Sequence, residues 1–173
     1  MSRITLLLAG PLIVAMLPAT LNAQDEAEQM IKEALSATIP EMAEGATVVD
    51  WENNVLKKGD NGWTCMPSPP GLKNAPMCLD APWLEWAHAW MNKTDVTINQ
   101  VGVAYMLVGD AGASNSDPFA TEPTDDWVVS GPHLMIIVPD NSTLDGMPTD
   151  PKNGGPWVMW KGTPYAHIMV PVR

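Results

Sequence analysis

The sequence has little positive charge, and this scarcity excludes several classes of partner. It contains 9 Lys and Arg against 20 Asp and Glu, which gives a formal net charge of −11 at pH 7. Binding to nucleic acid or to anionic lipid requires a concentration of Lys or Arg that neutralises phosphate groups. We therefore expect no nucleic-acid partner, and contact with a membrane only transiently, during export.

Cysteine is equally scarce, because Cys65 and Cys78 are the only two in the chain. They enclose a segment rich in proline and glycine that has no histidine and no second cysteine pair of the kind used by structural zinc sites. In an oxidising compartment a disulfide is the plain expectation, and closing this loop contributes about 3 kcal/mol of stability. A metal site formed by the two thiols is the alternative.

The N-terminal segment has the pattern of a secretory signal peptide. Arg3 supplies a short basic region, residues 4–17 are mostly apolar, and small residues lead to Ala23. A Gly-Pro pair interrupts the apolar run, which is shorter than the roughly 20 residues needed to span a bilayer. We predict a signal peptide over 1–23, one globular domain over 24–173 and a periplasmic or secreted location. A retained anchor is the alternative.

Residues 131–140 predict the central strand of the domain. The run 134–138 is apolar and rich in β-branched residues, and Pro132 and Pro139 enclose it. Side chains alternate between the two faces of a strand. One face should therefore carry His133, Met135 and Ile137, and the other Leu134, Ile136 and Val138.

The remaining elements predict an α+β domain. Asp80 is placed to cap a helix over 80–93 whose apolar residues surround almost the whole axis, so this helix should be largely buried. Altogether we expect a mainly antiparallel sheet of five or six strands, two helices packed on it and one disulfide. The other predicted elements are a helix at 24–38, ended by Pro40, a hairpin formed by strands at 46–51 and 63–66, a strand at 101–109, and a closing hairpin formed by 157–160 and 166–172.

Two long segments without predicted structure, 110–126 and 140–156, connect these elements. Loops of more than about 12 residues in a compact domain are usually functional or disordered. Because the first lies between two core strands, we interpret it as the lid of a pocket.

The three histidines are the first candidates for a site. Each falls in or at the start of a predicted buried element, and Glu85 lies three residues before one of them on the same side of a helix. Three imidazoles with a carboxylate can hold a transition metal, either Cu or Zn, and nearby Met135 and Met169 would favour Cu(I). Histidines that are simply hydrogen-bonded in the core are the alternative. The predicted metal ligands are His88, His133, His167 and Glu85.

The eight tryptophans, against one Phe and two Tyr, suggest a second function. Tryptophan stacks on sugar rings and other flat ligands, so a module that binds carbohydrate or another small ligand without a metal is an alternative. The competing interpretation is that most of these side chains fill the core between helix and sheet. The freer ones are then Trp51, Trp63 and Trp127.

A hydrolase is the third candidate function. Ser114 or Ser130 could act with His133 and Asp110, but no nucleophile-elbow spacing supports such a triad. Whether the protein catalyses any reaction stays open at this point.

Four motifs stand out in the C-terminal two thirds of the chain. They are Pro76-Met-Cys-Leu-Asp-Ala-Pro-Trp, Gly109-Asp-Ala-Gly-Ala-Ser-Asn with Asp117-Pro-Phe, Pro132-His-Leu-Met-Ile-Ile-Val-Pro-Asp, and Gly155-Pro-Trp-Val-Met-Trp-Lys-Gly-Thr-Pro-Tyr-Ala-His. With these motifs the chain resembles a group of uncharacterised exported bacterial proteins, a domain of unknown function. The resemblance implies export and a single domain, and it brings no activity or assigned residues. With it we expect an exported protein that has a His-lined pocket for a metal ion or a small molecule.

Overall fold

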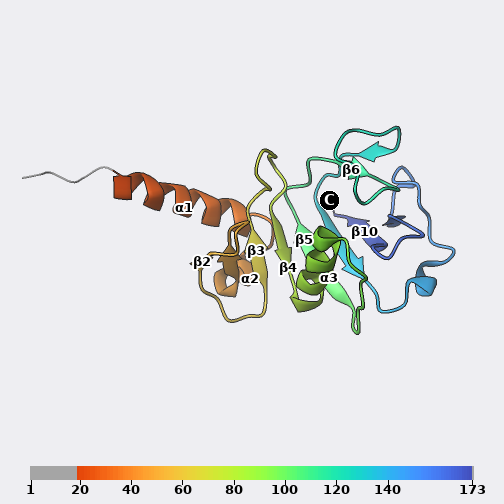
Figure 1. Ribbon diagram of the computed structural model, residues 1–173, viewed down its shortest axis with the longest axis horizontal. Helices are drawn as coiled ribbons and strands as arrows, with labels where there is room; N and C mark the ends of the chain where they lie inside the picture. Colours follow the sequence, from red (N-terminus) through yellow and green to blue (C-terminus); the bar gives the residue numbers. More distant parts are fainter. Residues whose placement is uncertain (1–18, 173) are drawn as a thin grey trace, which may run out of the picture.

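The computed structural model describes residues 19–172, which form an α+β fold around an eight-stranded sheet (Figure 1). The strand order is β2-β1-β3-β4-β5-β8-β10-β9, and β6 and β7 form a separate pair. The elements are α1 (Ala19–Leu35), α2 (Pro40–Gly45), β1 (Thr47–Val49), β2 (Val55–Lys57), β3 (Thr64–Met66), β4 (Met77–Leu79), α3 (Ala81–Asn92), β5 (Gly102–Met106), β6 (Ala113–Ser114), β7 (Trp127–Val128), β8 (His133–Ile137), the 3-10 helix η1 (Asn141–Leu144), β9 (Trp157–Met159) and β10 (His167–Pro171).

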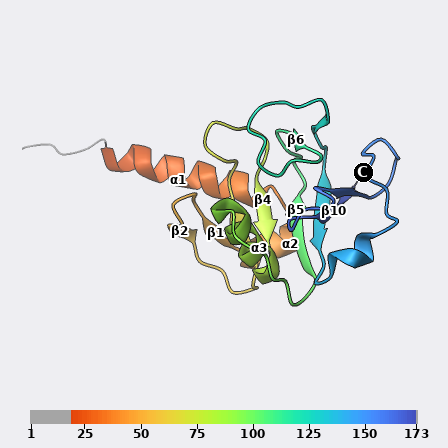
Figure 2. The same cartoon turned by 45° about the vertical axis from the view of Figure 1, so that its right-hand side comes forward.

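The helices α1 and α3 cover opposite faces of the sheet. Residues paired across neighbouring strands project to the same face. Cys78 pairs with Tyr105 and belongs to the cluster packed on α1, whereas Leu79 pairs with Ala104 and belongs to the cluster packed on α3. Figures 1 and 2 show α3 lying over the middle strands and α1 extending away beside β3 and β4. The two faces therefore have separate cores.

The predicted central strand is confirmed. β8 lies between β5 and β10 and pairs antiparallel with both. Its register brings Met135 opposite Ala104 on one side and opposite Met169 on the other. The closing hairpin is confirmed as well, because β9 pairs antiparallel with β10.

The N-terminal part of the sheet differs from the prediction of an antiparallel hairpin. β1 turns back through Asn53, whose φ of 66° is left-handed, and pairs antiparallel with the unpredicted strand β2. β3 then approaches the other edge of β1 and runs parallel to it, so the sheet is mixed. Asp50 stabilises the tight turn by accepting hydrogen bonds from the backbone N–H groups of Glu52 and Asn54 at 3.0 and 2.8 Å. The prediction of five or six strands is also too low, because three-residue strands carry little alternation to detect.

Two details of the helices also differ from the prediction. The first helix ends at Leu35. Pro40 begins the additional helix α2. The first turn of a helix tolerates proline because the backbone N–H groups there have no partner within the helix. In α3 the predicted cap is confirmed, since the Asp80 carboxylate accepts from the Trp83 N–H at 3.0 Å. The prediction that α3 is buried nearly all round is wrong, because Glu85 and His88 are exposed.

The predicted disulfide is present, in the cluster of residues that packs on α1. Cys65 and Cys78 are direct partners across β3 and β4, with 4.0 Å between their Cα atoms. Both are fully buried in one cluster with Ala34 of α1 and with Ala37, which follows that helix. The bond therefore fixes the proline-rich segment between the two strands.

Gly102 at the start of β5 marks a close approach between α3 and the sheet. A Cβ atom there would lie 2.8 Å from the side chain of Ile137 and 2.9 Å from that of Pro82. Only glycine allows the first turn of α3 to sit this near the sheet. The position of α3 over β5 and β8 depends on this contact.

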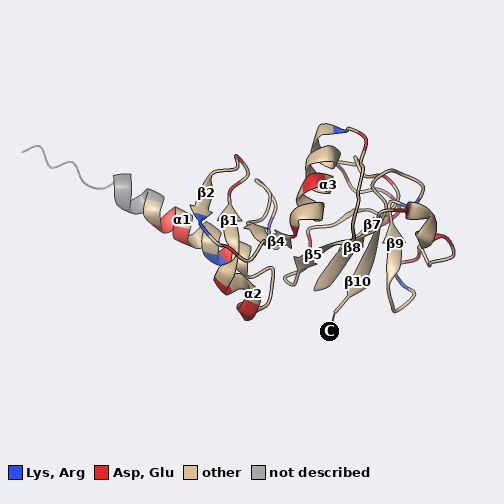
Figure 3. Ribbon diagram, turned by 90° about the horizontal axis from the view of Figure 1, so that it is seen from below, with Lys and Arg blue, Asp and Glu red and all other residues tan. Residues whose placement is uncertain are grey.

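Most of the predicted signal peptide, 1–18, lies outside the described residues, and α1 begins with the last five residues of that prediction. No helix among residues 19–172 is both long enough and apolar enough to cross a membrane. Acidic side chains recur over α1, α2 and the η1 end of the molecule (Figure 3).

Candidate functional site

A largely apolar cavity of about 440 Å³ lies on the α3 face of the sheet. This volume falls within the range typical of small-ligand sites. Helix α3 and the sheet form two of its sides, and the segment that follows β5 forms much of another. Its lining includes five tryptophans (Trp83, Trp86, Trp90, Trp127, Trp160), five methionines (Met77, Met106, Met135, Met159, Met169), His167, and Asp110, Ala111, Gly112, Ala113, Asp117, Pro118, Ala120 and Thr121 from the loop predicted as a lid.

Three indole rings form one wall of this cavity. Trp86 and Trp160 are parallel within 3°, with ring centroids 5.9 Å apart. Trp90 completes the set at 5.7 Å from Trp160 and 6.2 Å from Trp86, at angles of 23° and 21°. Nearly parallel indoles present flat, polarizable surfaces to whatever occupies the space beside them.

The same tryptophans hold the loop at the mouth of the cavity. The indole N–H of Trp160 donates to the carbonyl of Ser114 at 2.7 Å, and that of Trp90 donates to the carbonyl of Pro118 at 2.9 Å. Gly112, at a φ of +99°, brings the loop against Trp127, whose ring atom Nε1 would lie 2.2 Å from a Cβ atom at that position. The loop is thus held in place by hydrogen bonds and packing.

His167 lies in the floor of the cavity, on β10. Its ring is only 2% exposed and is surrounded by Trp83, Trp86 and Trp160, whose centroids lie between 4.9 and 5.7 Å away and whose planes are nearly perpendicular to it. Nδ1 lies 3.0 Å from the carbonyl of Tyr165. A carbonyl can only accept, so Nδ1 carries the proton and Nε2 carries the lone pair. Burial lowers the pKa of His167 to about 4, which keeps the ring neutral at pH 7.

His133 lies at the far end of the same sheet face, next to Asp110. Its Nδ1 donates to the carbonyl of Gly131 at 2.7 Å, and its Nε2 lies 4.0 Å from the carboxylate of Asp110. Burial lowers the pKa of His133, against the opposing effects of the Gly131 carbonyl and the Asp110 charge. Asp110 also accepts from the N–H groups of Gly112 and Ser130, at 3.0 and 2.8 Å. The pair therefore anchors both ends of the loop.

The structure does not bring the four predicted metal ligands together. His88 and Glu85 lie on the exposed side of α3, whereas His133 and His167 are buried. His133 pairs with Pro171, four residues beyond His167 on β10, so the two imidazoles stand at opposite ends of one strand pair. Among residues 19–172, no three His, Cys, Asp or Glu side chains are grouped so that they could hold a metal ion. Metal binding by these four residues stays a prediction, and the described residues provide no grouped set of ligands for it.

The geometry around the two serines gives no support to the hydrolase interpretation. Ser114 Oγ donates to Asp126 at 2.8 Å and accepts from the Asp117 N–H at 3.0 Å. Its hydrogen bonds therefore stabilise the loop. Hydrogen bonds from Ser116, Thr124 and Ser114 lower the pKa of Asp126 to about 2. In the described part of the chain, Ser130 Oγ and His133 Nε2 are both buried without a hydrogen-bond partner, so they do not bond to each other.

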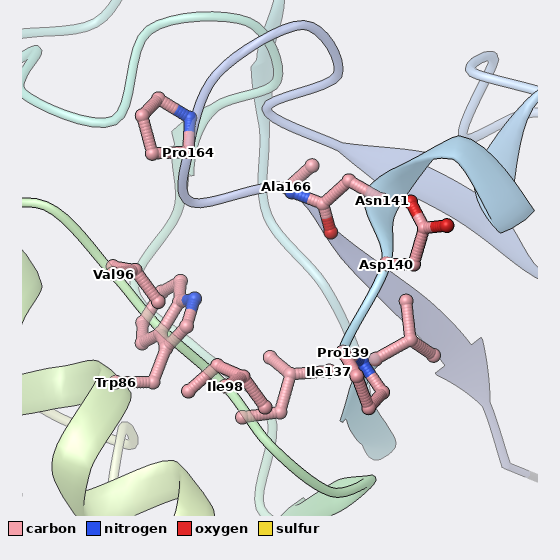
Figure 4. A pocket seen from close by; sticks show the side chains of 10 residues that line it. Trp86, Val96, Ile98, Ile137, Pro139, Asp140, Asn141, Pro164 and Ala166 are labelled. Atoms are coloured by element: carbon pink, nitrogen blue, oxygen red, sulfur yellow. The ribbon is translucent and has the colours of Figure 1, made fainter.

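A second, smaller hollow of about 130 Å³ lies on the other side of Trp86 (Figure 4). The N–H of this indole is buried and makes no hydrogen bond to the residues the structure describes. Asp140 and Asn141 lie across the hollow from it. A space of this size suits a few water molecules more than an organic ligand.

Comparison of the chain with protein-family models, with curated proteins and with solved structures gives no match in any of the three. The resemblance to exported bacterial proteins therefore stays an expectation.

Reasoning from sequence identified only Met135 and Met169 among the five methionines of the lining. The signal for these two is that β8 and β10 each carry a His followed two residues later by a Met, which alternation places on one face. The five methionines come from five strands, and only the pairing of these strands brings them to one cavity.

Proposed function

We propose that this protein is an exported binding protein for a small, mainly apolar ligand that carries a positive charge. The observation that carries the proposal is the composition of the 440 Å³ cavity. Tryptophan and methionine side chains dominate it, and among residues 19–172 its only charged groups are Asp110 and Asp117.

The apolar lining determines the body of the ligand. Flat indole faces favour an aromatic or alkyl group, because burying such surface contributes about 25 cal/mol per Å². Carbohydrate fits less well, since a sugar needs many hydrogen-bonding partners. Apart from the two carboxylates, the polar side chains in the lining are Thr121 and His167.

The charged groups in the lining determine which sign of charge the ligand should carry. No Lys or Arg of the described part of the chain lines the cavity, and His167 with its pKa of about 4 is neutral at pH 7. Indole faces attract cations, and carboxylates at the mouth add to this attraction. An ammonium group on an apolar body satisfies both features. Export is supported by the leader-like N-terminal sequence and by the disulfide, which is typical of oxidising compartments.

A pair of probes of similar size and opposite charge tests this proposal. We expect phenethylammonium to quench tryptophan fluorescence and raise the melting temperature in a saturable way, and phenylacetate to do neither. The variant Trp90→Leu removes part of the indole wall and should weaken binding about tenfold or more. The matched control is Trp63→Leu, because Trp63 packs on Tyr105 in the cluster beneath α1.

Equal responses to the two probes, or none to either, would contradict the proposed ligand class. A loss of binding in Trp63→Leu as large as that in Trp90→Leu would place the site elsewhere.

A further inference from the structure

The floor of the large cavity carries soft donor atoms, namely thioether sulfurs and an imidazole nitrogen. The charged residues of the sequence do not point to them. Met159 pairs directly with His167 across β9 and β10, and Met169 pairs directly with Met135 across β10 and β8. His167 and Met169 are two residues apart on β10. All four side chains therefore project from one face of three adjacent strands, and all four line the cavity.

This spacing suits a single ion. Directly paired residues have Cβ atoms about 5 Å apart, and residues two apart on a strand lie about 7 Å apart. Methionine has three rotatable bonds and a thioether at its end, so three such side chains and an imidazole can converge from these positions. Met159 and Met169 are buried at 3% and 1% exposure, which removes competing water from the donors.

His167 is prepared as a ligand by its surroundings. The Tyr165 carbonyl holds Nδ1–H at 3.0 Å, and this is the usual arrangement by which an outer partner orients a metal-binding imidazole and leaves Nε2 to coordinate. The surrounding indoles add cation–π attraction for a bound ion.

We infer that Nε2 of His167 and the thioether sulfurs of Met135, Met159 and Met169 bind one soft monovalent cation, Cu(I) or Ag(I). Thioether and imidazole donors without a carboxylate select such an ion and disfavour Ca²⁺ and Mg²⁺, which require oxygen. The site differs from the predicted three-histidine site, of which it retains His167 and the two nearby methionines, Met135 and Met169. It does not depend on the organic cation proposed above.

The test is a calorimetric titration of the intact, oxidised chain with Ag(I), which has the same preference for soft donors and undergoes no redox change. Both cysteines are in the disulfide, so no thiol competes. We expect one tight site in the wild type, and about a tenfold or greater loss of affinity in His167→Gln and in Met169→Leu. The matched controls are His88→Gln and Met91→Leu, because both residues are exposed on α3.

Substitution of Met by Leu conserves volume and rarely costs more than about 1.5 kcal/mol, so Met169→Leu should fold. X-ray absorption of the wild type loaded with Cu(I) gives a reading that needs no variant, and it should show sulfur and nitrogen neighbours around the ion. The absence of a tight Ag(I) site, equal losses in the test and control variants, or a coordination shell of oxygen would each overturn the inference.

Discussion

The two faces of the sheet are built from different kinds of side chain, and the difference supports the proposal that one face mainly stabilises the fold while the other binds a ligand. Beneath α1, small residues pack tightly around the disulfide; Ala34, Ala37, Ala46 and Val48 are all 0% exposed. Beneath α3, large flat and flexible residues surround a cavity of about 440 Å³. Small residues let elements approach until no space remains, whereas stacked indoles and methionines leave a hollow that a ligand can fill. We therefore assign folding stability mainly to the first face and binding to the second.

The largest expected effect is a dependence of stability on pH. It belongs to the face beneath α3, because both buried histidines lie on that face. The pKa of His167 is 6.5 in the unfolded chain and about 4 in the folded one. Between these pH values the unfolded state takes up a proton that the folded state does not. Above pH 6.5 the free energy of unfolding should have its full value. It should fall by about 3 kcal/mol as the pH is lowered to about 4. The lowered pKa of His133 acts in the same direction.

Urea unfolding at half-unit pH steps measures this dependence. The exposed His88 provides the control, since His88→Gln should keep the slope and His167→Gln should reduce it. A free energy of unfolding that is flat between pH 6.5 and 4.5 would contradict the burial of neutral imidazoles.

An effect of similar size is expected from the face beneath α1. Replacing Cys65 and Cys78 together by Ala opens the disulfide, and the unfolded chain regains the entropy that the closed loop had lost. The free energy of unfolding should fall by about 3 kcal/mol in urea titrations. A loss well under 1 kcal/mol would mean that the bond does not support this half of the fold.

These expectations rest partly on what the sequence already predicts and partly on what only coordinates reveal. Helix α3, strand β8 and the β9–β10 hairpin follow from local signals, namely the Asp80 cap, the flanking prolines and the apolar alternation. The disulfide follows from a count of two cysteines. Strands β2 and β4 have three residues each and too little pattern to detect.

The site was less predictable, because register and pairing decide which side chains meet. His133 and His167 share a face of the sheet, but their four-residue offset separates them and brings Met135 and Met169 together between them. His88 lies at a helix position that faces solvent, which sequence periodicity could not distinguish from burial in so apolar a helix.

The smallest expected effect compares enlarged alanines on the two faces. Ala34 belongs to α1 and is completely buried in the cluster between this helix and the sheet, so Ala34→Leu should overpack that core and lower the free energy of unfolding by about 1–3 kcal/mol. Ala87 is half-buried and lines the cavity, so the added methylene groups of Ala87→Leu have space to occupy. We expect the free energy of unfolding of this variant to lie within about 1 kcal/mol of the wild-type value. Equal destabilisation of the two variants would mean that both faces are packed alike.

The central claim, that the hollow beneath α3 is the binding site, is tested most directly by titrating wild type and Ala87→Leu with phenethylammonium while following tryptophan fluorescence. We predict saturable binding to the wild type and a loss of about tenfold or more in the variant, whose new side chain takes up ligand space. Binding of equal strength to both proteins would contradict the account.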